Sequence, residues 1–157
     1  MTILSILYLS FFSNAQEKTV EVMSFERFEP MLHNENDSLY IFNFWTTWCK
    51  PCVAELPYFE KLNKVFASEK LKIILVSLDF ADDFDTRLMP FLLKNNIQSK
   101  VILLDESNPN TFIDKISPKW SGAIPATYLY KGKLNSFYEK SFTYEELESI
   151  VKLKLSE

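Results

Sequence analysis

The amino-acid sequence predicts an α/β protein in which helices flank a central mixed β-sheet. Helical patterns alternate with short, nearly continuous apolar runs, which are typical of buried parallel strands. Two later β-patterned runs flank Lys131-Gly132, which predicts a final antiparallel hairpin. The chain has 157 residues, 47% of them hydrophobic, which suffices for one domain with its own core.

The first residues predict a leader that is separate from this domain. Residues 1–15 carry no charged side chain, and the apolar run over 3–12 has the length of a signal-peptide core. A bilayer-spanning helix needs ~20 residues, and no run in the chain is that long. The Ser-Asn-Ala ending at Ala15 fits a cleavage site, so we expect export to the periplasm or an equivalent space and a mature domain over residues 16–157. Because no Lys or Arg precedes the apolar run, a buried N-terminal strand or helix remains the alternative.

The other elements follow from hydrophobic periodicity and from turn signals. Residues 16–23 are expected to form a short lead-in. Helices are predicted over residues 24–33, 50–67, 84–95, 110–116 and 143–155. Strands are predicted over residues 39–45, 71–78, 101–104, 126–130 and 133–138.

Local signals support the ends of several helices. Ser24 suits the N-cap of the first helix. Pro51 fits the first turn of the second helix, whereas Pro57 lies inside that helix and predicts a kink. Thr143 and Glu146 form a capping box at the start of the last helix.

The charge pattern argues against a nucleic-acid-binding protein. The formal net charge is −4, and the sequence has no cluster of basic residues of the kind that nucleic acids require. An acidic stretch at Asp79, Asp82, Asp83 and Asp85 lacks the spacing and the glycine of an EF-hand loop, so we predict a solvated loop there. His33 is predicted to be a surface residue at a helix end.

The chain's only two cysteines lie in the stretch W-T-T-W-C-K-P-C, residues 45–52, where a predicted strand meets a predicted helix. The outward-facing N–H groups of the helix N-terminus and the neighbouring Lys50 would stabilise a thiolate at Cys49. Cys52 lies one helical turn further on, close enough to resolve a mixed disulfide. Pro51 would stiffen the turn between them.

Two other interpretations of the cysteine pair are less favourable. A structural zinc site needs about four ligands. Only His33 could join the two thiols as a nitrogen ligand, and it lies in a different predicted element, so we expect no metal. A purely structural disulfide across two intervening residues closes too small a loop to stabilise the chain much. A redox-active disulfide is the preferred interpretation.

The stretch F-W-T-T-W-C-K-P-C, residues 44–52, resembles the active-site segment of the thioredoxin superfamily. Its continuation through Glu55 to Pro57 resembles the TlpA/ResA-like branch of exported thiol–disulfide oxidoreductases. Residues 84–104 are similar to the insertion of that branch, and G-A-I-P-A-T over 122–127 resembles the cis-proline loop. The resemblance implies a thioredoxin-like three-layer sandwich, a central mixed β-sheet flanked by helices.

The resemblance also implies a protein thiol–disulfide oxidoreductase with three catalytic residues. Cys49 would attack the substrate and Cys52 would resolve the mixed disulfide. Thioredoxins proper carry a proton-transferring aspartate at the position of Asn43, which cannot titrate. Glu55 is therefore expected to take over proton transfer; the alternative is a surface helix residue.

Substrate binding is expected to involve Trp48, Pro51, Ile124 and Pro125. Trp48 would shape the docking surface beside the cysteines. A cis bond between Ile124 and Pro125 would let this loop offer its backbone groups to a bound peptide. Without the cysteines, a proline that merely starts a strand would be the preferred interpretation of Pro125.

The expected partners are protein disulfide substrates and a membrane electron donor, with no organic cofactor, metal or nucleic acid, and the protein is expected to be monomeric. The reducing direction is preferred on the family resemblance. A disulfide-donating oxidase and a binding module with a static disulfide are the alternatives. A peroxidase on the same fold would need a P-x-x-x-T-x-x-C site, which the sequence lacks.

Overall fold

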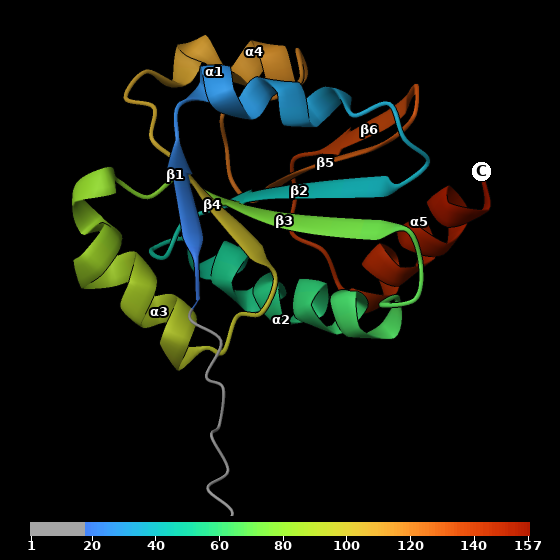
Figure 1. Ribbon diagram of the computed structural model, residues 1–157, viewed down its shortest axis with the longest axis horizontal. Helices are drawn as coiled ribbons and strands as arrows, with labels where there is room; N and C mark the ends of the chain where they lie inside the picture. The colour runs from blue at the N-terminus through green and yellow to red at the C-terminus, as the bar shows by residue number, and fades with distance from the viewer. Residues whose placement is uncertain (1–17) are drawn as a thin grey trace, which may run out of the picture.

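A computed structural model describes residues 18–157 of the chain. The predicted leader over residues 1–15 lies outside the described residues. The described part contains a six-stranded sheet in the order β1-β4-β3-β2-β5-β6 (Figure 1). The strands are β1 (Val20–Met23), β2 (Leu39–Trp45), β3 (Leu71–Ser77), β4 (Lys100–Leu104), β5 (Ala126–Lys131) and β6 (Leu134–Tyr138).

The sheet is mixed, as predicted. β1, β4, β3 and β2 run parallel to one another, whereas β5 is antiparallel to β2 and β6 is antiparallel to β5. In the turn of this final hairpin Gly132 has φ +58°, which glycine adopts without steric cost. The expected lead-in over residues 16–23 is partly wrong, because Val20–Met23 pairs with β4 and forms an edge strand.

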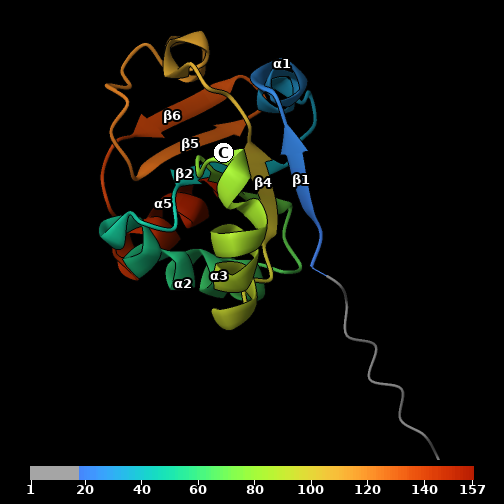
Figure 2. The same cartoon turned by 90° about the vertical axis from the view of Figure 1, so that its left-hand side faces the viewer.

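The helices lie on both faces of the sheet and make three layers. α2, α3 and α5 cover one face, whereas α1 and α4 lie on the other (Figures 1 and 2). The α-helices are α1 (Phe25–Phe28), α2 (Lys50–Val65), α3 (Met89–Lys94), α4 (Ile113–Ile116) and α5 (Tyr144–Ser156). Short helical turns add η1 (Glu29–His33), η2 (Ala81–Asp83), η3 (Phe84–Leu88) and η4 (Pro109–Thr111).

The helix predicted over residues 84–95 is present but is not α-helical throughout. Phe84–Leu88 forms a π-helical turn, and the α-helix starts at Met89. Pro90 has no backbone N–H, so it cannot donate the α-helical hydrogen bond to the carbonyl of Thr86. The change of helix type lies next to this proline.

Alternating strand residues fill two apolar clusters, one on each side of the sheet. In β2, Leu39 and Ile41 belong to the cluster that includes residues of α2 and α5. Phe42 and Phe44 belong to the cluster that includes residues of α1 and α4. Phe28 of α1 is fully buried there, with its ring centroid 5.4 Å from that of Phe42. Because β2 is packed on both faces, the chain that leaves its end starts from a fixed position.

The helix caps agree in part with the sequence. The predicted capping box of α5 is confirmed, since Thr143 Oγ1 accepts a bond from the Glu146 N–H and the Glu146 carboxylate accepts one from the Thr143 N–H. Ser24 occupies the N-cap of α1, but its side chain makes no capping hydrogen bond. The N-terminus of α1 therefore has an N-cap residue with extended backbone but no side-chain cap.

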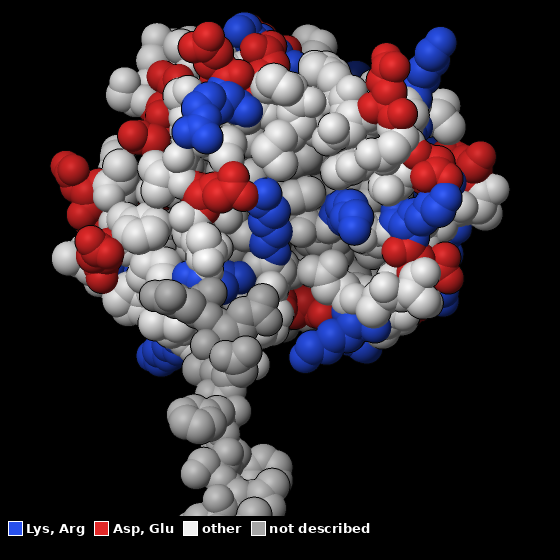
Figure 3. Space-filling view, viewed as in Figure 1, with Lys and Arg blue, Asp and Glu red and all other residues white. Residues whose placement is uncertain are grey.

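The surface carries both signs of charge. Acidic and basic side chains are intermixed over the face that Figure 3 shows. His33 is exposed, as predicted. No helix within residues 18–157 has the length and the apolar character needed to cross a membrane.

Candidate functional site

The two cysteines lie where β2 passes into α2. Cys49 is the N-cap residue of α2, and the Cys52 N–H donates a hydrogen bond to Cys49 Sγ at 3.3 Å. Pro51 lies in the first helical turn, as predicted, and is exposed. A sulfur at this position faces the positive end of the helix dipole, which favours the thiolate over the thiol.

Cys49 and Cys52 form a disulfide in the structure, and the two sulfurs differ in access. Cys49 is 7% exposed, whereas Cys52 is fully buried. A partner can therefore reach only the sulfur of Cys49 without a rearrangement of the helix. The arrangement can support an attacking thiol at Cys49 and an internal thiol at Cys52.

Asp79 fixes the loop that leads from β2 to Cys49. Its carboxylate accepts bonds from the Thr47 N–H at 3.0 and 3.1 Å, from Thr47 Oγ1 at 2.7 Å and from Ser77 Oγ at 2.8 Å. Asp79 is only 3% exposed, so the expectation of a solvated loop is wrong for this residue. The ends of the parallel strands β2 and β3 are adjacent, which brings Asp79 to Thr47 across 32 positions of the chain.

The loop before β5 lies on the other side of Cys49. The Ile124–Pro125 peptide bond is cis, and the Ile124 carbonyl oxygen lies 3.9 Å from Cys49 Sγ. The indole Nε1 of Trp120 donates a hydrogen bond to the Ala123 carbonyl at 2.8 Å, which fixes the backbone of this loop. Gly122 has φ +94°, which few other residues adopt. Pro125 is buried and Ile124 is partly exposed, so the loop presents backbone as well as side chains to the cysteines.

Glu55 is a buried carboxyl on the first turns of α2 and is only 1% exposed, which contradicts a surface position. Its Oε2 accepts a bond from the Phe142 N–H at 2.8 Å, and its Oε1 accepts one from Asn43 Nδ2 at 2.9 Å. Burial raises the pKa of Glu55 from 4.5 to about 7, even though both hydrogen bonds lower it. Glu55 can therefore gain or lose a proton near neutral pH.

Asn43 connects Glu55 to a residue that the sequence did not single out. Asn43 Nδ2 also donates to Thr127 Oγ1 at 3.1 Å, and all three residues are buried. Asn43 Oδ1 has no hydrogen-bond partner among residues 18–157. If the amide turns over, Oδ1 can accept a bond from a protonated Glu55, so the pair fits both protonation states. The pairing of Asn43 with Thr127 follows from the register of β2 and β5, which sequence patterns alone do not fix.

Two exposed aromatic side chains follow the residues that fix the cysteine loop. Trp48 is 57% exposed and Phe80 is 73% exposed, and they directly follow the hydrogen-bonded residues Thr47 and Asp79. Large exposed aromatic groups are typical of interaction surfaces. Among residues 18–157, no group of three or more His, Cys, Asp or Glu side chains could hold a metal ion.

A family model described as the AhpC/TSA family matches residues 14–135 of the sequence. This match covers more than half of the chain. The chain belongs to the AhpC/TSA family. The thioredoxin-like likeness inferred from the cysteine stretch is thereby confirmed at the level of the fold and the family.

Two curated relatives carry names that agree with this assignment. The thioredoxin-like protein YneN of Bacillus subtilis is 31% identical over 110 residues, which cover 69% of this chain and 60% of the relative. The thiol-disulfide oxidoreductase ResA of Oceanobacillus iheyensis is 29% identical over 116 residues, which cover 68% of this chain and 52% of the relative. The chain thus spans between half and two thirds of the length of these relatives.

Solved structures confirm the fold. A thiol:disulfide interchange protein of the thioredoxin family from Chlorobium tepidum superposes with a TM-score of 0.65 over 81% of this chain and 84% of its own, at 20% identity. StoA from Bacillus subtilis superposes with a TM-score of 0.58 over 74% of this chain and 84% of its own, at 21% identity. The central mixed sheet with helices on both faces is therefore the thioredoxin-like architecture expected from the sequence.

Proposed function

We propose that this protein is a thiol–disulfide oxidoreductase that acts on disulfides of exported proteins. The observation that carries the proposal is the unequal burial of a disulfide at a helix N-terminus, next to a cis peptide bond. Cys49 is slightly exposed and Cys52 is fully buried. The names of the relatives support the same chemistry.

In the reducing direction, the Cys49 thiolate attacks one sulfur of a substrate disulfide. A bond forms between Cys49 and the substrate, and the other substrate sulfur leaves as a thiolate that takes up a proton. The Cys52 thiolate then attacks Cys49 Sγ, which restores the Cys49–Cys52 disulfide and releases the second substrate thiolate. Two electrons pass from the protein to the substrate, and a membrane electron donor returns them.

Glu55 is the proton acceptor for Cys52 in this scheme. It follows Cys52 by one turn of α2, and its pKa of about 7 lets it take a proton in one step and return it in another. Asn43 replaces the titratable group of thioredoxins proper and donates a hydrogen bond to Glu55 instead.

Trp48, Pro51, Ile124 and Pro125 hold the substrate around the attacking sulfur. Trp48 and Pro51 are exposed and lie within two positions of Cys49 in the chain, and the Ile124 carbonyl oxygen lies 3.9 Å from Cys49 Sγ. The cis bond before Pro125 leaves backbone groups of the loop available to an extended substrate segment, which can pair with it in the manner of a β-strand. The protein works as an exported monomer and needs no metal or organic cofactor.

The first experiment equilibrates the purified protein in glutathione or dithiothreitol buffers and follows tryptophan fluorescence, because Trp48 adjoins the disulfide. Known couples run from about −270 mV for a reductase to about −120 mV for a disulfide donor. We expect a value near the reducing end. A value near the oxidising end would reverse the direction, and the absence of a reversible couple would leave a static disulfide and refute the proposal.

A variant distinguishes turnover from binding. Cys49→Ser removes the attacking sulfur, so disulfide reduction should fall to the uncatalysed rate. If Cys49→Ser reduced model disulfides as fast as the parent protein, the assignment of the attacking thiol would be wrong.

A further inference from the structure

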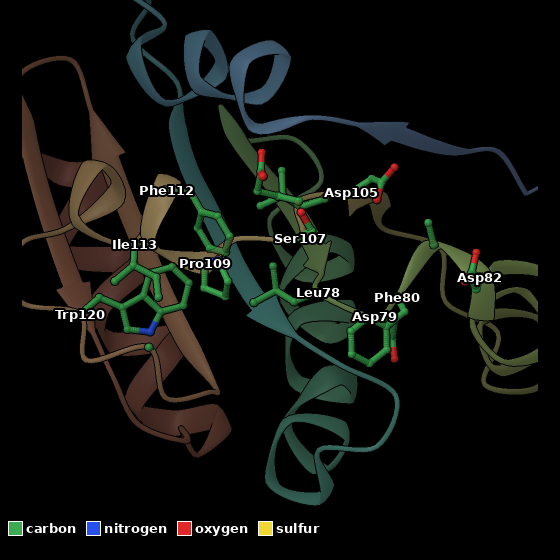
Figure 4. A pocket seen from close by; sticks show the side chains of 14 residues that line it. Leu78, Asp79, Phe80, Asp82, Asp105, Ser107, Pro109, Phe112, Ile113 and Trp120 are labelled. Atoms are coloured by element: carbon green, nitrogen blue, oxygen red, sulfur yellow. The ribbon is translucent and has the colours of Figure 1, made fainter.

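A pocket of about 440 Å³ opens between the loop after β3, the loop after β4 and the segment before β5 (Figure 4). Its walls are mainly apolar and include three aromatic side chains, those of Phe80, Phe112 and Trp120. The apolar lining includes Leu78, Leu104, Phe112, Ile113 and Trp120. All five of these side chains belong to the cluster that holds α1 and α4 or pack against it, so the pocket is anchored in a fixed part of the core.

The pocket adjoins the two loops that flank Cys49. Asp79 lines one wall, and the same side chain accepts the bonds from Thr47, two residues before Cys49. Gly122 also lines the pocket, two residues before Ile124, whose carbonyl oxygen lies 3.9 Å from Cys49 Sγ. A polypeptide held at Cys49 therefore has the pocket within a few residues of its reactive cysteine, since an extended chain covers about 3.3 Å per residue.

The rim of the pocket is acidic. Asp82, Asp105 and Glu106 line it, and none of them takes part in an ion pair among residues 18–157. No Lys or Arg of the described part of the chain lines the pocket. The cavity is apolar, and three carboxylates without an ion-pair partner lie around its mouth. The ligand that binds best to such a site has an apolar body with a positive charge beside it.

The exposed ring of Phe80 lies at the same mouth, next to Asp79 (Figure 4). It is 73% exposed, a large area for an aromatic side chain without a partner. Phe80 and Trp48 follow the hydrogen-bonded pair Asp79 and Thr47, so the loop at the pocket mouth is joined to the loop that leads to Cys49.

We propose that this pocket selects the substrate: it binds a bulky apolar side chain of the substrate protein, followed by Lys or Arg, within about three residues of the reactive cysteine. The apolar side chain lies against Phe112 and Trp120, and the cation meets the carboxylates of the rim. The proposal rests on the proposed function for the identity of the substrate as a protein disulfide, but the pocket can be tested apart from the chemistry.

The test uses three synthetic peptides that each carry one cysteine as a mixed disulfide with glutathione. The peptides differ in one dipeptide, which lies three residues from the cysteine. This dipeptide is Phe-Lys, Phe-Glu or Ser-Lys. The reduced protein converts each to the peptide thiol and glutathione while Cys49 and Cys52 become a disulfide. We expect the Phe-Lys peptide to react about tenfold faster than the Ser-Lys peptide at low concentration, because the phenyl ring is buried. We expect it to react a few-fold faster than the Phe-Glu peptide, because of the exposed rim charges.

Two variants and a matched control address the pocket itself. Ser107→Trp fills the pocket from an exposed position, and the triple change Asp82→Asn, Asp105→Asn, Glu106→Gln removes the charges of the rim. The first should abolish the preference for Phe, and the second should abolish only the preference for Lys over Glu. The control changes three exposed glutamates away from the pocket lining to Gln and should keep both preferences. Its positions are Glu35, Glu69 and Glu145.

A small disulfide separates failure of the pocket from failure of the chemistry. Bis(2-hydroxyethyl) disulfide cannot occupy the pocket while it reacts, so all variants should reduce it equally. If the parent protein reduces it but treats the three peptides alike, the pocket proposal is wrong and the proposed function stands. If the parent protein does not reduce it, the proposed function fails, and calorimetry with the same peptides carrying Ser for Cys decides the pocket alone. Equal binding of the three Ser peptides would overturn the pocket proposal.

Discussion

Replacing the buried carboxyl of Glu55 by an amide should make the oxidised protein more stable at alkaline pH. Glu55 is 1% exposed, and burial raises its pKa from 4.5 to about 7. This shift corresponds to roughly 3 kcal/mol. The free energy of unfolding falls by this amount once the pH is high enough to ionise Glu55 in the folded protein. Below pH 4.5 the carboxyl is protonated in both states and imposes no penalty. As the pH rises to about 7, only the unfolded chain loses the proton, so stability falls, and above pH 7 the penalty is constant.

The glutamine of Glu55→Gln has no charge to desolvate and can keep the local hydrogen bonds. Its carbonyl oxygen can accept from the Phe142 N–H as Glu55 does now. Its amide can donate to Asn43 Oδ1, the acceptor that is unpartnered in the structure, once the Asn43 side chain turns over. We therefore expect the difference in unfolding free energy between variant and parent to grow by roughly 1–3 kcal/mol from pH 4.5 to pH 8.

Urea unfolding of the two oxidised proteins, followed by circular dichroism at half-unit pH intervals, measures this difference. Glu69→Gln is the matched control, because Glu69 is exposed and its side chain makes none of the hydrogen bonds or ion pairs described among residues 18–157. The control difference should not vary over this range. A difference for Glu55→Gln that stays flat from pH 4.5 to pH 8 would refute the reasoning, and so would a variant that is less stable than the parent at pH 8.

Three further changes test other parts of the site and fold. Asp79→Ala should lower the unfolding free energy by about 2–4 kcal/mol, because the partly buried N–H and hydroxyl of Thr47 lose their acceptor, and Asp79→Asn should lower it by less; urea unfolding measures both. Cys52→Ser should accumulate a covalent adduct between Cys49 and a disulfide peptide, visible by mass spectrometry; a variant that turns over without an adduct would contradict the resolving role. Thr143→Ala removes one half of the capping box and should cost about 1 kcal/mol by the same unfolding assay.

The sequence predicted those parts of the fold that depend on local patterns. The apolar run of β2 and the capping box of α5 each lie within a few consecutive residues, and both were predicted at the right place. β1 was missed because Val20–Met23 has only four residues, and only Met23 among them is buried. Its strand conformation comes from pairing with β4, some eighty positions later, which no local pattern records.

In the site, too, the features that depend on adjacent residues were predicted, and those that depend on distant residues were not. The positions of Cys49 and Cys52 at a helix start follow from adjacent residues, whereas the burial of Asp79 depends on a partner in another loop. A usable signal was nonetheless present. Ser77 and Asp79 stand at the end of one buried strand, and Thr47 stands at the end of the preceding one. Since the ends of neighbouring parallel strands meet at one edge, these polar groups could have been expected to pair.

The hydrogen bonds of Glu55 also limit how the cysteine helix can move. One carboxylate oxygen holds the backbone before α5, 87 positions away, and the other holds Asn43 of β2. The first turns of α2 are thus tied to both neighbouring elements through a single group whose charge changes near pH 7. If Glu55 takes up the proton of Cys52, as we propose, both acceptor bonds weaken, because a neutral carboxyl accepts more weakly than a carboxylate. In the proposed scheme, proton transfer at the buried thiol and the hydrogen bonds that hold the start of α2 are therefore coupled through Glu55. A change near Phe142 should then alter the pH dependence of the second reaction step without touching either cysteine.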